Sequence, residues 1–157
     1  MSTALLDAVV KKNRARLIPF MLALYVLAFL DRSNIGFAKQ TYQIDTGLSN
    51  EAYALGAGIF FVVYAFLGVP ANLLMRKLGA RTWIGTTTLL WGFLSDAMAW
   101  ADTEAKFLSV RTLLGAAEAG FFPGMIYLTS QWFPQRNRAS IMGLFYMGAP
   151  LALTLGS

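Results

Sequence analysis

Residues 107–133 read FLSVRTLLGAAEAGFFPGMIYLTSQWF, an apolar run that contains two ionisable groups, Arg111 and Glu118. The run is longer than the roughly 20 residues that an α-helix needs to cross about 30 Å of hydrocarbon. Because lipid offers the backbone no hydrogen bonds, a single segment of this kind is stable in a bilayer as a helix. The stretch therefore predicts a transmembrane helix with charged groups inside it.

Other apolar runs of helical length precede and follow this segment, and none has the apolar/polar alternation of a barrel strand. They cover residues 17–38, 52–75, 82–101 and 140–157. Residues 1–16 form an N-terminal segment before the first run, and this segment is expected to be cytoplasmic. The expected fold is an all-α membrane protein, with a partial transmembrane bundle over residues 17–157.

The composition supports a bilayer as the solvent. Apolar residues make up 57% of the 157 positions and charged residues only 13%, against about a quarter charged in a typical soluble domain. The net charge of +5 sits in short clusters between apolar runs, which argues against nucleic acid as a partner. Without cysteine or histidine, the chain offers no thiolate or imidazole chemistry, so proton transfer is expected to use carboxylates. No metal or other cofactor is expected.

The Lys and Arg residues predict the orientation. On one side of the predicted spans lie Lys11, Lys12, Arg14, Arg16, Arg76, Lys77, Arg81, Arg136 and Arg138. Only Lys39 and Lys106 lie on the other, so the positive-inside rule places the N-terminus in the cytoplasm. A cleaved secretory signal is the alternative for residues 17–30, but Asp31 and Arg32 follow where a small-residue cleavage site is needed.

Five charged side chains fall inside predicted spans: Asp31, Arg32, Asp96, Arg111 and Glu118. Asp96 lies close to the external edge, where its carboxylate can reach water, so it is not assigned to the site. Each of the other charges costs at least ~2.5–3.5 kcal/mol near the bilayer centre, so a functional reason is expected. At 1.5 Å per residue, Asp31 lies about 21 Å and Arg111 roughly 24 Å from the cytoplasmic edge, and Glu118 lies near the midplane. Arg111, Gly115 and Glu118 share one helix face. We interpret these charges as a transport site, and the alternative is a static ion-pair network that holds two helices together.

Three further features bear on this site. Tyr64 lies near the middle of the run 52–75 and either donates its hydroxyl to a polar ligand or satisfies a neighbouring carbonyl. The Pro123-Gly124 pair predicts a kink just beyond Glu118. Tryptophans near span ends, such as Trp83, are interpreted as interface anchors.

Three segments resemble a known family: residues 31–36 (DRSNIG), residues 111–124 (RTLLGAAEAGFFPG), and Trp132-Phe133-Pro134 with Arg136 and Arg138. On these motifs the chain resembles the N-terminal portion, helices one to five, of the major facilitator superfamily. Within it, the chain is similar to the anion:cation symporter family, and most of all to bacterial sugar-acid permeases of the kind that carry L-rhamnonate.

The resemblance implies an inner-membrane proton symporter for small organic anions that works by alternating access. By similarity, Asp31 and Glu118 are the proton-coupling carboxylates. Arg32, Tyr64 and Arg111 are the corresponding substrate-binding residues, and the partners are a small carboxylate substrate, protons and the lipid bilayer. One departure is that Arg76 stands where the superfamily usually has an aspartate in the loop after the second helix.

Other readings stay open from the sequence. Family members have twelve helices, so we expect that the C-terminal half of the transporter is missing and that these 157 residues alone do not transport. The alternatives are a proton-coupled exporter of amphipathic compounds, a pore or scaffold, or an inert truncated membrane fragment. An enzyme is not expected, because the sequence shows no nucleophile–base pair, metal cluster or phosphate loop.

Overall fold

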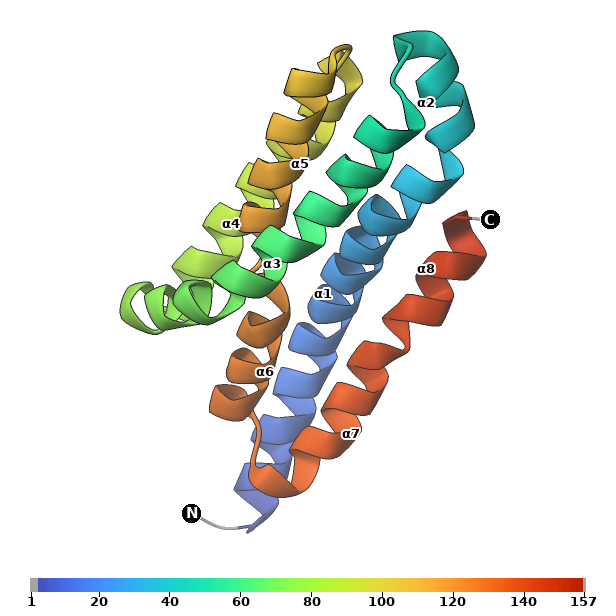
Figure 1. Cartoon of the computed structure of the whole chain (residues 1–157). Helices are drawn as coiled ribbons and strands as arrows, with labels where there is room; N and C mark the ends of the chain where they lie inside the picture. The colour runs from blue at the N-terminus through green and yellow to red at the C-terminus, as the bar shows by residue number, and fades with distance from the viewer. Residues whose placement is uncertain (1–2, 157) are drawn as a thin grey trace. The chain divides into compact units, whose positions relative to one another are not determined.

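The computed structural model describes residues 3–156, and within this range every regular element is helical (Figure 1). The fold class predicted from the sequence is therefore confirmed. In chain order the elements are α1 (Thr3–Phe37), α2 (Lys39–Thr46), α3 (Asn50–Leu78), α4 (Ala80–Ala97), the 3-10 turn η1 (Met98–Trp100), α5 (Glu104–Glu118), α6 (Phe121–Trp132), α7 (Gln135–Tyr146) and α8 (Gly148–Gly156).

Local sequence signals set several helix ends. The Ser49 hydroxyl accepts a hydrogen bond from the backbone N–H of Ala52 at 3.0 Å and so caps the start of α3. The α3–α4 junction is a single residue, Gly79, with φ of 84°. That conformation strains any residue with a Cβ, so glycine is required for so sharp a connection.

Prolines explain two interruptions. The fourth predicted span is divided where α5 ends at Glu118 and α6 begins at Phe121, and the fifth is divided between α7 and α8. A proline has no N–H for the carbonyl four residues before it. That carbonyl belongs to Ala119, within the first break, for Pro123, and to Tyr146, the last residue of α7, for Pro150. The kink predicted just beyond Glu118 is thus present as a break in the helix.

The helices form two compact units, residues 35–124 (the first unit) and residues 1–34 with 125–157 (the second unit). In the first unit, α5 packs along α3 and, less extensively, along α4. In the second, the ring of Tyr25 on α1 lies 4.4 Å from that of Phe145 on α7, and Asp7 pairs with Arg136 at the start of α7.

The outward surface of these helices is strongly apolar. Large side chains such as Phe66 and Phe93 are 78% and 72% exposed. Exposure of many large apolar side chains is unfavourable in water and favourable in lipid. Two helices, Leu5–Phe37 within α1 and Asn50–Leu78 (α3), are long and apolar enough to cross a membrane by length and composition. The limits of the individual spans and of the N-terminal segment stay predictions.

Candidate functional site

Arg111 is held between α5 and α3 in the first unit. Its side chain is only 2% exposed, and its Nε donates to the carbonyl oxygen of Gly56 at 3.4 Å. The guanidinium carbon lies 4.6 Å from the centroid of the Phe60 ring, within the range of a cation–π interaction. Helix α3 therefore supplies both a backbone acceptor and an aromatic face to a buried cation, which needs such partners.

Two glycines allow the helices to come this close. A Cβ on Gly115 of α5 would lie 2.5 Å from the carbonyl oxygen of Phe60, and one on Gly56 of α3 would lie 2.2 Å from the ring of Phe107. Small residues at a membrane helix interface let the backbones approach within contact distance. These two glycines thus have a packing role at the contact between α3 and α5.

Glu118 is the last residue of α5 and is 1% exposed. It follows Arg111 by seven residues and Gly115 by three, so the three side-chain positions share a face, and all three are buried. The predicted common face is therefore present. The rise along α5 separates the Arg111 and Glu118 backbones by about 10 Å. A carboxyl group placed here is shielded from water, next to the break that ends the helix.

Tyr64 and Arg111 both contact the ring of Phe60. The Tyr64 ring is stacked on that of Phe60, with centroids 6.0 Å apart and an interplanar angle of 19°. Phe60 itself is fully buried. The sequence reasoning missed Phe60, although its position one helical turn before Tyr64 on α3 was a usable signal. The structure thus brings Arg111 and Tyr64 together around one phenylalanine.

Asp31 and Arg32 lie near the end of α1, in the second unit, and both are half-buried. Ser33, directly after them, donates its hydroxyl to the carbonyl of Leu30 at 3.1 Å. The helix is therefore continuous past the two charges. That they share a transport site with the charges of α5 stays a prediction.

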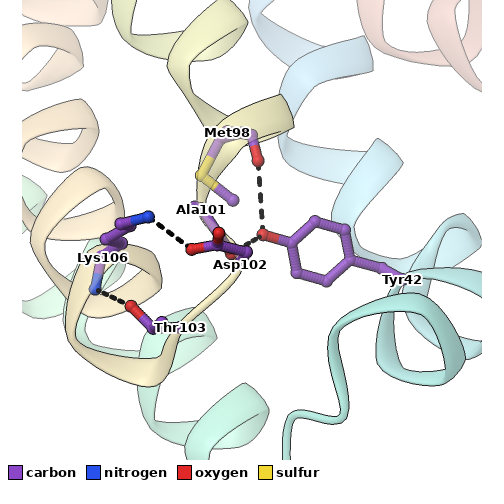
Figure 2. Close-up of polar contacts among 6 residues, drawn as sticks. All are labelled: Tyr42, Met98, Ala101, Asp102, Thr103 and Lys106. Atoms are coloured by element: carbon purple, nitrogen blue, oxygen red, sulfur yellow. Dashed lines mark hydrogen bonds and ion pairs between the residues drawn. The ribbon is translucent and has the colours of Figure 1, made fainter.

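A cluster of aromatic residues positions the beginning of α5. Figure 2 shows the Tyr42 hydroxyl, from α2, donating to the carbonyl oxygens of Ala101 at 2.6 Å and Met98 at 3.3 Å. Burial, together with the negative charge of Asp102, raises the pKa of Tyr42 above its ordinary value. The ring of Phe107 stacks on that of Tyr53 at 5.2 Å. These contacts fix the first turn of α5, one turn before Arg111.

The same turn carries an exposed ion pair. Lys106 donates to the Asp102 carboxylate at 2.6 Å, and the Thr103 hydroxyl caps the start of α5 by accepting from the Lys106 N–H at 3.4 Å (Figure 2). The hydrogen bond from Lys106 holds the pKa of Asp102 below its usual range. Both groups lie at the surface, so they order the turn rather than contribute to the buried site.

Buried ionisable side chains on a helix face, a proline-divided helix and an apolar outer surface are features of a polytopic membrane protein. Residues 21–157 match the family model described as the Major Facilitator Superfamily, and the chain belongs to this superfamily. The superfamily predicted from the sequence is confirmed.

Similar proteins carry transporter names rather than enzyme names. The chain is 98% identical over all 157 residues to the "Inner membrane transport protein RhmT" of Escherichia coli, of which it covers 37%. It is 47% identical over its whole length to a "Putative tartrate transporter" of Agrobacterium vitis, covering 36% of that protein. It is also 44% identical over 94% of its length to a "Quinolone resistance transporter" of Acinetobacter baumannii, covering 34%. The chain thus spans just over a third of these relatives.

A solved structure supports the fold. The chain aligns with a bacterial homologue of the human lysosomal transporter Spinster, in an inward-facing and occupied conformation, with a TM-score of 0.82. The alignment covers 88% of this chain and 30% of that one, at 22% sequence identity. At this identity the likeness shows the fold alone.

Proposed function

We propose that the full-length carrier containing this segment takes up small organic anions together with protons, by alternating access. Sugar acids such as L-rhamnonate are the proposed substrates. The observation that carries the proposal is the face of α5 on which Arg111 and Glu118 are both buried, 2% and 1% exposed. Family membership and the likeness to a putative tartrate transporter support the same reading.

Each predicted residue has a role in this mechanism. Asp31 and Glu118 take up protons from the periplasmic side, and their neutralisation lowers the charge that is buried while the loaded carrier reorients. Arg32 and Arg111 provide positive charge for the substrate carboxylate, and Tyr64 offers a hydroxyl to the neutral part of the substrate. The carrier lies in the inner membrane as a multi-pass protein, with its N-terminus in the cytoplasm.

Glu118→Gln tests the coupling role. The protein is a full-length chimera in which these 157 residues replace the matching segment of the Escherichia coli relative, reconstituted in proteoliposomes. A glutamine keeps the size of the side chain but cannot release a proton. We therefore expect exchange of labelled against unlabelled acid to continue, and accumulation driven by a pH gradient to be lost.

Glu104→Gln is the matched control, because Glu104 is an exposed acid at the other end of the same helix. This variant should accumulate the acid as the unmodified chimera does. Uphill accumulation that survives in Glu118→Gln would remove the proton-coupling assignment.

A second candidate function is a proton-coupled exporter of amphipathic compounds, which the 44% identity to a quinolone resistance transporter favours. Counterflow separates the two candidates. If the first proposal holds, vesicles preloaded with sugar acid should exchange labelled sugar acid, and vesicles preloaded with a quinolone should not exchange labelled quinolone. Exchange of the quinolone alone would support the exporter.

A further inference from the structure

We propose that Phe60 is a positioning residue that holds the Arg111 guanidinium and the Tyr64 ring in the arrangement that binds the organic anion. The inference rests on the proposed function and extends it to a residue that carries neither charge nor hydroxyl. Phe60 acts through its two neighbours, all three residues lying in the first unit.

The ring of Phe60 interacts directly with the buried cation. Phe60 is fully buried, and the guanidinium carbon of Arg111 lies 4.6 Å from its ring centroid. The negative face of an aromatic ring attracts a cation most strongly where water is excluded. A hydrogen bond from Nε to the carbonyl oxygen of Gly56, 3.4 Å long, adds to this contact. The ring therefore helps to fix the direction in which the guanidinium points.

The same ring stacks on Tyr64. The two rings are nearly parallel, at 19°, with centroids 6.0 Å apart. Stacking restricts the rotation of the Tyr64 side chain and so restricts where its hydroxyl can point. One aromatic side chain thus contacts both residues of the first unit that are proposed to meet the substrate.

The backbone of Phe60 is itself held in place. A Cβ added to Gly115 would lie 2.5 Å from the carbonyl oxygen of Phe60. Helix α5 therefore packs directly against this turn of α3. Because the backbone is fixed by this helix contact, replacing the ring should disturb the orientation of Arg111 and Tyr64 more than the crossing of the helices. The expected consequence is a weaker hold on the substrate rather than loss of the fold.

The test is the uptake kinetics of the full-length chimera in proteoliposomes. Phe60→Leu removes the aromatic face and keeps an apolar side chain. Loss of a desolvated cation–π contact is expected to raise the KM for sugar-acid uptake roughly tenfold, with a smaller change in the maximal rate. Phe66→Leu is the control, since Phe66 lies on the same helix and is 78% exposed, and its KM should not change.

A second variant keeps the test decisive if leucine impairs folding. Replacing Phe60 with 3,4,5-trifluorophenylalanine preserves the shape of the ring and removes the negative charge density of its face. The same rise in KM supports the positioning role, whereas an unchanged KM overturns it, because packing alone would be preserved. If the unmodified chimera carries no organic acid at all, the proposed function fails and this inference fails with it. An unchanged KM in a working carrier overturns the inference alone.

Discussion

Gly115→Ala should disrupt the helix contact on which the buried face of α5 depends. The added Cβ would lie 2.5 Å from the carbonyl oxygen of Phe60, about 0.9 Å closer than the 3.4 Å at which ordinary contact begins. The obstacle is backbone, so no side chain can rotate away and the helices must separate. Overpacking of this kind costs about 1–3 kcal/mol. The separation also moves Arg111 away from Phe60, so sugar-acid uptake should fall as well.

The assay is thermal unfolding of the full-length chimera in detergent, together with uptake in proteoliposomes. Gly58→Ala is the matched control, because a Cβ on Gly58 of α3 would have no atom within 4 Å. Alanine is the better helix former by roughly 0.5–1 kcal/mol, so the control should keep or raise the unfolding temperature. If Gly115→Ala and Gly58→Ala give the same unfolding temperature and the same uptake, α5 does not pack on α3 as closely as described.

The remaining predictions concern the ends of helices. Arg138 donates to two carbonyls at the end of α6, at 2.8 and 3.0 Å, so Arg138→Gln should lower the free energy of unfolding by about 1.5–3 kcal/mol. Arg136→Gln removes only an exposed ion pair and should cost about 0–1 kcal/mol; equal losses in thermal unfolding would contradict this. The lowered pKa of Asp102 means that its stabilising effect is present above its ordinary value of 3.8 and is lost as the pH falls below it. Asp102→Asn should therefore lower the unfolding temperature at pH 7, and this difference should become smaller as the pH falls below 3.8; a difference that does not change with pH would rule out the ionised pair as its source.

The main features of the fourth span could be predicted from the sequence. Helical spacing fixes which residues share a face, so the common face of Arg111 and Glu118 followed from their separation of seven residues. The break after Glu118 followed from Pro123, because the missing N–H acts at a fixed distance along the chain. Pro150 offered the same signal for the division between α7 and α8, and that division was not predicted.

Features that depend on contacts between helices could not be predicted in this way. Spacing places Phe60 on a face of α3, but its contact with Arg111 depends on how the two helices cross and on both rotamers. Trp83 was interpreted as an interface anchor, yet it is half-buried, and a Cβ on Gly120 would lie 2.6 Å from its Nε1. Helix α2 was not predicted at all, because a short polar segment has no apolar periodicity to reveal it.

The most direct test of proton-coupled uptake is the movement of protons with the substrate. Proteoliposomes containing the full-length chimera and an internal pH-sensitive dye would receive an external sugar acid, with no other gradient imposed. The account predicts acidification of the interior that depends on the substrate, saturates with its concentration and disappears in Glu118→Gln. Uptake of labelled acid without any change in internal pH would contradict it.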